Sequence, residues 1–197
     1  LIKMKKNKTI VIASHNSGKI KEMAFFLKKI SVNILSAKDF NLSEPIENGK
    51  TFEENALIKA RYVNKKVKKT SIADDSGLVI PILNGKPGIF SARWAGKSKN
   101  FNIAMKKLNN LIFKKKVNAY YVSTLAICWN NRKEKTFTGK IFGEIIWPPR
   151  GNFGFGYDPI FIPNSYNKTF GEMKIKHKNR ISHRAVVFKK FITYLNK

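Results

Sequence analysis

The chain has 197 residues, enough for one domain with a sizeable hydrophobic core. It carries 39 Lys and Arg against 12 Asp and Glu, which gives a net charge of +27. No apolar run approaches the roughly 20 residues that cross a bilayer, and the basic start lacks the pattern of a signal peptide. The single cysteine, Cys128, excludes an internal disulfide, so we predict a soluble cytoplasmic protein with a buried core thiol.

The positive charge is spread over the whole chain instead of being gathered on one arm or helix. A nucleic-acid-binding protein would also be rich in lysine, because it gains affinity by releasing counterions from phosphates. The even spread favours a solvated surface with an attraction for small polyanions, and we expect no specific nucleic-acid partner.

The first predicted unit is a strand, a polar loop and a helix. Residues 9–13 are apolar and read as a buried strand, and an amphipathic helix is predicted over about 19–30, followed by a second strand at 32–35. A loop at a helix N-terminus presents free N–H groups, and Lys19 adds a cation, so phosphate is a suitable ligand. The alternative is an ordinary loop in which Ser or Asn caps the helix.

A polar loop at 39–50 contains Glu47 and precedes a helix predicted to start at Thr51 and to continue over 55–67. Thr51 and Glu54 match a capping box at the start of that helix. Glu53 and Glu54 complement the helix dipole, whereas Glu47 has no such structural explanation.

Two adjacent carboxylates follow the next predicted strand. Ser71–Ala73 reads as a short strand that delivers Asp74 and Asp75 to the rim of a sheet, beside Gly77, which permits a tight turn. The alternative is a turn in which one aspartate caps the backbone. Side chains alternate along a strand, so Asp74 and Asp75 are expected to point in opposite directions, and the one that faces away from the site is expected to brace the structure.

The middle of the chain predicts a distinct lobe. It contains a strand or strand pair at 78–83 and a helix at about 99–113. Between them lies a loop at 87–96, in which Arg93 could contact an anion or a ring or simply lie on the surface. Two long strands at 117–129 and 133–146 flank a predicted turn at 130–132.

The last third combines a glycine-rich segment with a basic helix start. In residues 151–161, glycines alternate with aromatic residues. This pattern would let the backbone approach a ligand with a flat ring, and it is equally typical of a bulged hairpin. A helix capped by Ser182 is predicted to run to Leu195. His183 and Arg184 lie in its first turn, where the helix dipole disfavours cations, and this indicates a bound polyanion.

Five segments together, in this order, closely resemble the non-canonical purine nucleoside triphosphate pyrophosphatases, the inosine/xanthosine triphosphatase family. The resemblance extends from about Thr9 to Leu195. The segments are Ser14-His15-Asn16-Ser17-Gly18-Lys19, Thr51-Phe52-Glu53-Glu54-Asn55-Ala56, Ala73-Asp74-Asp75-Ser76-Gly77-Leu78 with Pro87 to Arg93, Gly154-Phe155-Gly156-Tyr157-Asp158-Pro159-Ile160-Phe161, and Ile181-Ser182-His183-Arg184.

The resemblance implies an α/β fold, with a long curved mixed sheet flanked by helices. It implies that residues 1–197 form a single two-lobed domain with the active site in a cleft between the lobes, and that the protein is a homodimer. The implied reaction is the Mg²⁺-dependent hydrolysis of ITP, dITP and XTP to the monophosphate and pyrophosphate, which cleanses the nucleotide pool.

The resemblance also assigns residue roles. Asp75 is the implied general base and metal ligand, and Glu47 is the second metal ligand. Residues implied to bind the substrate are Ser14, His15, Asn16, Ser17, Gly18 and Lys19 for the triphosphate, and Ser76, Phe155, Gly156, Tyr157, Asp158, Lys178, His183 and Arg184 for the nucleotide. Two departures are mild, since His15 stands where a glycine is frequent and Trp94 replaces a common tyrosine.

The residue chemistry agrees with these roles. One or two carboxylates suffice for a hard divalent cation when phosphates and waters complete its shell, and Lys19 and Arg184 can offset charge that develops on a phosphoryl group. Selection of a 6-oxo purine is expected from donors that an adenine amine would leave unpaired, with Phe155 against the ring. The alternatives are a pyrophosphatase that prefers thymidine or uridine triphosphate, and a basic nucleic-acid-binding module.

Overall fold

The computed structural model describes residues 8–112, 116–130 and 133–196. The chain divides into two compact units. The first comprises residues 1–75, 123–139 and 184–197, and the second comprises residues 76–122 and 140–183. Within the described ranges, none of the helices combines the length and the apolar character that crossing a membrane requires.

The strands form one mixed sheet in the order β2-β1-β3-β4-β5-β6. Their bounds are β1 Thr9–Ile12, β2 Asn33–Ser36, β3 Thr70–Val79, β4 Val117–Cys128, β5 Glu134–Ile145 and β6 Phe161–Pro163. Strand β1 pairs in parallel with β2 and β3, whereas β5 and β6 are antiparallel. The predicted α/β fold with a mixed sheet and flanking helices is therefore confirmed.

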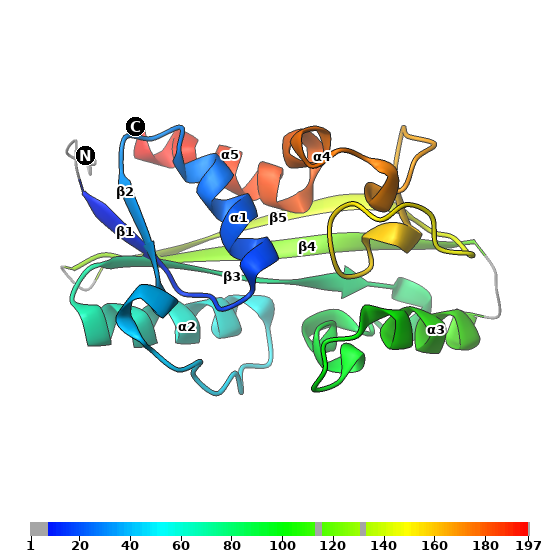
Figure 1. The fold of residues 1–197 in the computed structure, drawn as a ribbon, viewed down its shortest axis with the longest axis horizontal. Helices are drawn as coiled ribbons and strands as arrows, with labels where there is room; N and C mark the ends of the chain where they lie inside the picture. Colours follow the sequence, from blue (N-terminus) through cyan, green and yellow to red (C-terminus); the bar gives the residue numbers. More distant parts are fainter. Residues whose placement is uncertain (1–7, 113–115, 131–132, 197) are drawn as a thin grey trace. The chain divides into compact units, whose positions relative to one another are not determined.

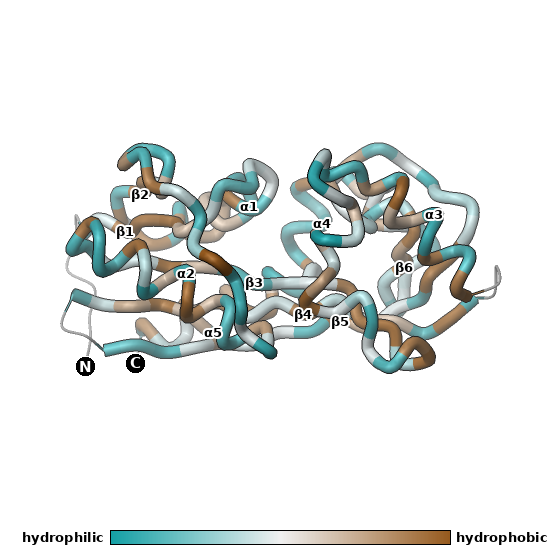
Figure 2. The backbone as a smooth tube through the Cα atoms, turned by 90° about the horizontal axis from the view of Figure 1, so that it is seen from below, coloured by the Kyte–Doolittle hydropathy of each residue, from teal (hydrophilic) through white to brown (hydrophobic). Residues whose placement is uncertain are grey.

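In the first unit, helices cover both faces of the sheet (Figure 1). Helices α1 (Ser17–Leu27) and α5 (His183–Leu195) lie on one face, and α2 (Phe52–Val67) lies on the other. Strand β1 is apolar and buried from Ile10 to Ile12, while α2 alternates hydrophobic and hydrophilic residues (Figure 2). A strand buried on both faces needs apolar residues at every position, whereas a covering helix needs only one apolar stripe.

The alternation of side chains along the strands separates two cores in this unit. Ile10, Ile12 and Ile72 pack with residues of α1 and α5. Val11 and Ala73 pack with the apolar stripe of α2. Successive strand residues therefore face opposite helix layers, which fixes the direction of every polar side chain that β3 carries.

The second unit has its own core, built around helix α3 (Phe101–Ile112) and the strands of that unit. Aromatic residues from the glycine-rich segment and the turn after it, including Tyr157, Phe161 and Phe170, are fully buried in this core. Short 3₁₀ turns at 81–83, 88–90, 93–95, 158–160 and 170–172 replace longer helices in the connections. The predicted loop character of 87–96 and 151–160 is confirmed apart from these turns.

Strand β3 corrects one prediction. Asp74 and Asp75 do not end a short strand at the rim of the sheet, because β3 continues without a break from Thr70 to Val79. Gly77 lies inside this strand and makes no turn, and the further strand expected at 78–83 ends at Val79. From the sequence alone, Asp74 and Asp75 suggest the end of a strand, because two carboxylates are rarely buried inside a sheet without compensating cations.

Other predicted bounds need smaller changes. Helix α4 (Ile175–Ile181) was not predicted, and Ser182 terminates it immediately before α5 begins. The predicted extension of α3 to Phe113 lies outside the described residues. The same holds for positions 131 and 132 of the predicted turn, and for the basic start before residue 8.

The contact between α1 and α5 gives a test of the first core. The rings of Phe26 and Phe188 are stacked at 4.8 Å, and Phe188 is fully buried. Replacing Phe188 with Ala should lower the free energy of unfolding by about 3–5 kcal/mol, because it leaves a cavity and removes the stacked ring. Urea denaturation measures the change, and the exposed neighbour Lys189→Ala should change the stability by less than about 0.5 kcal/mol. A loss below about 1 kcal/mol at Phe188 would contradict this account of the core.

Candidate functional site

One lysine joins the two carboxylates that are predicted to bind metal. The Nζ atom of Lys59, on helix α2, lies 3.0 Å from Asp75 Oδ1 and 3.1 Å from Glu47 Oε2. Lys59 and Asp75 are both buried, and Glu47 is half-buried. The structure thus brings Asp75 and Glu47 together, through a cation that occupies the buried stripe of α2.

The pKa values of this cluster follow from burial and charge. Desolvation raises the pKa of Asp75, and the nearby Glu47 adds to that effect, while Lys59 and Lys19 oppose it only in part. Desolvation by itself would lower the pKa of Lys59, but the facing carboxylates outweigh it and raise that pKa. Lys59 therefore stays charged, while Asp75 becomes a stronger base than an exposed aspartate.

The start of α2 anchors the loop that carries Glu47. The buried side chain of Asn55 accepts a hydrogen bond from the Gly49 amide at 2.9 Å, and Glu54 Oε2 accepts one from the Lys50 amide at 2.6 Å. Thr51 Oγ1 accepts from the Glu54 amide, so the predicted cap is present. The reciprocal half of the predicted capping box differs, since Glu54 binds the amide of Lys50 instead of that of Thr51.

The residues around Asp75 fit a hard divalent cation. Asp75 Oδ2 is buried and has no hydrogen-bond partner among the described residues. Carboxylate oxygens are the ligands that Mg²⁺ prefers, and Mg²⁺ usually keeps several waters and binds few carboxylates. Across the described ranges, no group of three or more His, Cys, Asp and Glu side chains is arranged to hold a metal ion. Asp75 and Glu47 could therefore supply only two protein ligands, and phosphate and water oxygens would have to complete the shell.

Asp74 points to the opposite face of β3 and organises a second buried cluster. Its Oδ2 atom lies 2.9 Å from Arg184 Nη2 and 3.0 Å from Lys19 Nζ, and Ser123 donates a hydrogen bond to Oδ1. Glu22, on α1, pairs with Arg184 Nη1 at 2.8 Å. The charges of the two cations and the two carboxylates therefore compensate one another. This geometry agrees with the predicted bracing role of Asp74.

Charge pairing overrides burial in this cluster. Desolvation opposes ionisation of Asp74, but Arg184 and Lys19 hold its pKa well below the usual range. Desolvation likewise disfavours the Arg184 cation, and Asp74 and Glu22 more than compensate, so its pKa is raised. The cation at the start of α5 suggests a bound polyanion when only the sequence is considered. In the structure, Asp74 and Glu22 compensate the Arg184 cation, so its position does not by itself require a bound polyanion, and contact with one stays a prediction.

The predicted phosphate loop is ordered at the start of α1. Asn16 caps the helix by accepting a hydrogen bond from the Lys19 amide at 3.1 Å, and Ser14 Oγ accepts one from the Asn16 amide at 3.2 Å. His15 Nε2 contacts the Leu42 carbonyl at 2.7 Å, and its Nδ1 lies 3.4 Å from Glu44. Ser17 and Gly18 form the first turn of the helix. The capped loop and the predicted phosphate-binding loop are thus compatible interpretations of one structure.

In the second unit, Asp158 organises three of the residues predicted to bind the nucleotide. Its Oδ2 atom accepts hydrogen bonds from Lys178 Nζ at 2.6 Å and from the Phe155 amide at 2.8 Å, and the Lys178 ammonium lies 4.8 Å from the centre of the Phe155 ring. Gly154 has φ = +77°, and a Cβ atom there would lie 2.1 Å from Asp158 Oδ2. Glycine is therefore required at position 154 for both conformation and space.

The other predicted residues of this unit have varied surroundings. Ser76 is half-buried in β3, and Gly156 has φ = +72° and lies near Phe101. Tyr157 is buried, and its hydroxyl donates to the Ser91 carbonyl at 3.1 Å, so it packs the core. His183 is buried against Tyr121. Their contacts with a nucleotide stay predictions.

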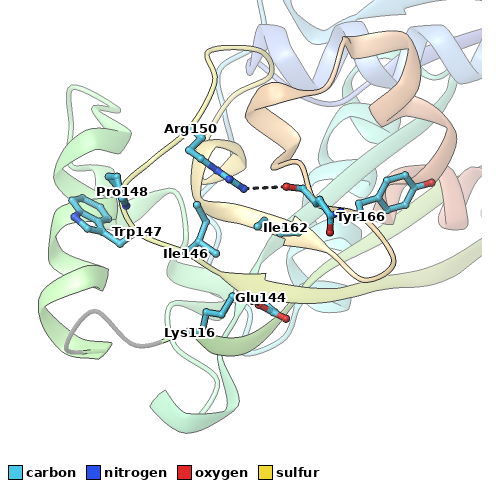
Figure 3. Close-up of a pocket in the computed structure, with 9 residues that line it drawn as sticks. Lys116, Glu144, Ile146, Trp147, Pro148, Arg150, Ile162 and Tyr166 are labelled. Carbon is cyan, nitrogen blue, oxygen red and sulfur yellow. Dashed lines mark hydrogen bonds and ion pairs between the residues drawn. The ribbon is translucent and has the colours of Figure 1, made fainter.

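A separate pocket of about 460 Å³ lies within the second unit (Figure 3). Its lining residues are Lys116, Glu144, Ile146, Trp147, Pro148, Arg150, Ile162, Tyr166 and Asn167. Arg150 donates to the Asn167 carbonyl at 3.2 Å, and Lys116 lies 2.6 Å from Glu144. None of the predicted site residues lines this pocket.

All 12 acidic residues of the chain lie in the described ranges, and each contacts a hydrogen-bond donor or a basic side chain. Besides Glu22, Glu47, Asp74, Asp75 and Asp158, these are Asp39 with Ser36, Glu44 with His15, Glu53 with Thr136, Glu54 with Lys50, Glu134 with Arg61, Glu144 with Lys116, and Glu172 with Arg150. The few acids of this chain thus serve internal contacts.

Comparison with known proteins identifies the family of this chain. The model of the Ham1 family matches residues 10–194. The chain belongs to the Ham1 family. The chain is 42% identical over 202 residues to a protein of Agrobacterium fabrum named dITP/XTP pyrophosphatase, and the match covers 94% of each protein. A protein of the same name from Zymomonas mobilis is 41% identical over 187 residues, covering 93% of this chain and 90% of that protein.

A solved structure supports the Ham1 assignment. The Ham1 protein of Staphylococcus aureus superposes with a TM-score of 0.86 at 36% identity, covering 96% of this chain and 98% of that one. The Ham1 fold therefore extends over nearly all of this chain.

Sequence reasoning missed two residues that this Ham1-family structure places inside the clusters. Lys59 falls within the predicted apolar stripe of α2, and Glu22 lies beside the buried Met23 on α1. A charged residue at a position that the helical period buries was the available signal, since such a residue needs a partner of opposite charge. The partners could not be identified without the fold.

The Asp74 cluster of this Ham1-family protein predicts a pH-dependent contribution to stability. Asp74→Asn should lower the free energy of unfolding at pH 7 by about 3–5 kcal/mol, because it leaves the buried Arg184 and Lys19 with one carboxylate fewer. The folded-state pKa of Asp74 is lowered, so its stabilisation is present above the ordinary Asp pKa of about 3.9 and is lost as the pH falls through the lowered pKa. The difference between the two proteins should therefore shrink below about pH 4.

Urea denaturation from pH 7 to pH 3 measures this difference. The exposed Glu53→Gln variant keeps an acceptor for Thr136 and serves as the control, with little change in stability at any pH. A gap between wild type and Asp74→Asn that does not vary with pH would contradict the assigned ionisation.

Proposed function

We propose that this chain hydrolyses the non-canonical purine nucleoside triphosphates ITP, dITP and XTP to the monophosphate and pyrophosphate, and so cleanses the nucleotide pool. The observation that carries the proposal is the buried carboxylate of Asp75, fixed by Lys59 beside Glu47 and retaining one oxygen without a partner among the described residues. The names of the relatives, dITP/XTP pyrophosphatase, support the same reaction.

In the proposed mechanism, Asp75 orients and deprotonates the attacking water. Lys59 donates to Oδ1, which leaves Oδ2 to accept a proton from the water. The raised pKa of Asp75, caused mainly by desolvation, makes this carboxylate a better proton acceptor near neutral pH. Hydrolysis by in-line attack then depends chiefly on positioning and on compensation of charge.

Lys19 is the proposed ligand of the triphosphate. Its ammonium donates to the Asp74 carbonyl at 3.2 Å and pairs with Asp74 Oδ2 at 3.0 Å. An ammonium has three N–H donors, so one donor stays available for a phosphate oxygen in the described surroundings. Asp74 fixes the direction of that donor, and Arg184 in turn fixes Asp74. The loop from Ser14 to Gly18 is proposed to add backbone N–H groups.

Asp75 and Glu47 are the proposed ligands of a divalent cation, with Mg²⁺ as the expected ion. When bound, such an ion supplies charge neutralisation for the phosphates and polarises the reacting phosphoryl group. Lys59 holds both carboxylates in position through its two ion pairs. The small number of protein ligands leaves room for phosphate and water oxygens.

Recognition of the base is assigned chiefly to residues of the second unit. Lys178 is oriented by Asp158 and lies over the Phe155 ring, so a donor and an aromatic face are held together. We propose that Lys178 and His183 favour a 6-oxo group and that Phe155 stacks on the ring, with Ser76, Gly156, Tyr157 and Arg184 as further contacts. A 6-amino group would leave these buried donors unpaired.

The proposal includes a homodimer, which follows from the family resemblance, and a cytoplasmic location, which the single cysteine favours. Light scattering on the purified protein tests the dimer, and the cellular location is open to fractionation. Neither is required by the mechanism above.

A nucleotide panel tests the proposed substrate class. The purified protein should give kcat/KM values at least about 100-fold higher for ITP, dITP and XTP than for ATP, because a site built around donors rejects a base that cannot accept them. Chromatography of the products should yield the monophosphate and pyrophosphate. A ratio near one, or a preference for thymidine or uridine triphosphate, would overturn the assignment.

Replacing Asp75 with Asn tests its catalytic role. We expect kcat for ITP to fall by about 10²–10⁴-fold, because the amide cannot accept the proton of the water. Circular dichroism and the melting temperature establish that the variant is folded. The exposed Asp39→Asn variant, whose amide oxygen can still accept from Ser36, should keep wild-type turnover. Turnover of Asp75→Asn within a few-fold of wild type would remove Asp75 from this role.

A further inference from the structure

Tyr121, on strand β4, contacts two of the residues that are proposed to recognise the base. Its ring is stacked on the His183 ring, with the ring centres 4.7 Å apart and the planes inclined by 11°. Its hydroxyl donates a long hydrogen bond of 3.5 Å to Asp158 Oδ1. All three side chains belong to the second unit and are buried, and Tyr121 is 7% exposed.

The hydrogen bond from Tyr121 engages the second oxygen of the Asp158 carboxylate. The other carboxylate oxygen, Oδ2, accepts from Lys178 and from the Phe155 amide. A carboxylate whose two oxygens are both engaged cannot rotate without losing a bond, and burial makes each lost bond costly. The hydroxyl of Tyr121 therefore limits the rotation of Asp158, which in turn sets the position of the Lys178 ammonium.

The ring of Tyr121 is itself held in place. It meets the Phe161 ring edge-on at 4.8 Å, and the Phe170 ring lies 6.1 Å away. A side chain locked by aromatic neighbours can transmit its own position to the groups that it touches. The stacked face of Tyr121 thus fixes the plane of the His183 imidazole.

We propose that Tyr121 is a positioning residue for base selection. It acts through His183 and Asp158 and does not itself touch the substrate. This inference rests on the proposed function, because it concerns the same base-recognising residues. Its consequence is that discrimination between a 6-oxo and a 6-amino purine depends on a side chain of the second unit's core.

Two substitutions separate the contributions of the hydroxyl and the ring. Tyr121→Phe removes the bond to Asp158 and keeps the stacking, and we expect the KM for ITP to rise about 3- to 10-fold with little change in kcat. Tyr121→Leu also removes the stacking on His183, and we expect kcat/KM for ITP to fall about 10- to 100-fold. In both variants the ratio of kcat/KM for ITP to that for ATP should decrease.

Inorganic tripolyphosphate and a neighbouring tyrosine provide the controls. Tripolyphosphate lacks a base, so its inhibition constant against ITP should stay within about twofold of the wild-type value in both variants, since its contacts lie with the phosphate-binding groups. Tyr120→Phe makes the same change at the preceding residue, whose ring packs near Phe142 and Lys140. This variant should leave the ratio of kcat/KM for ITP to that for ATP unchanged. A general loss of folding would instead weaken tripolyphosphate and ITP together.

The outcomes distinguish this inference from the proposed function. If wild type prefers ITP over ATP but both Tyr121 variants keep the wild-type KM and ratio, the positioning role is overturned and the proposed function stands. The positioning role is also overturned if the variants lose tripolyphosphate binding in parallel with ITP binding. If wild type shows no preference for ITP, the proposed function fails, and the inference fails with it.

Discussion

The buried, alternating carboxylates of strand β3 constrain the rest of the first unit. Asp74 and Asp75 are consecutive, so the pleat sends them to opposite faces of the sheet. Neither can stay ionised inside a protein without a facing cation. Lysine on α2 compensates Asp75, and Lys19 with Arg184 compensates Asp74. Helices on both faces are thereby required by electrostatics as well as by burial of the apolar residues.

Each unit uses a carboxylate as the centre of a polar cluster. Asp74 gathers donors from α1, β4 and α5, and Asp158 gathers donors from a glycine-rich loop, α4 and β4. A buried carboxylate with several donors is rigid, because any rotation breaks a bond that water cannot replace. These residues hold other groups in place, while Asp75 retains the open oxygen that the proposed mechanism uses. Rigid support and the proposed reactive group thus belong to different aspartates.

Much of the fold could be predicted from local patterns. The apolar run of β1, the helical period of α2 and the two long strands β4 and β5 predict the correct elements, since each depends on nearby residues. The continuous β3 could not be predicted, because its polar centre is stable only through Lys59, Lys19 and Arg184, which lie far away in sequence. Helix α4 was missed for a related reason: Lys178 is buried there by its pairing with Asp158.

The residues of the candidate site could likewise be predicted only in part from the sequence. The sequence pointed to Asp75, Glu47 and the loop before α1, whose residue types indicate their own chemistry. It could not reveal Lys59, Glu22 or Tyr121, whose importance comes only from the groups that they contact. The sequence indicates that Arg184 needs an anion close by, and the fold shows that Asp74 and Glu22 compensate it inside the protein.

The internal use of every acidic side chain has a consequence for the kinetics of substrate capture. With all 12 acids engaged in contacts within the protein, the surplus of +27 charges generates a long-range positive potential. A nucleoside triphosphate is a multiply charged anion, so this potential accelerates its diffusional encounter with the protein. Dissolved salt screens the potential over a Debye length of about 8–10 Å, so the encounter rate should fall steeply with ionic strength, whereas the short ion pairs of the buried clusters are far less affected.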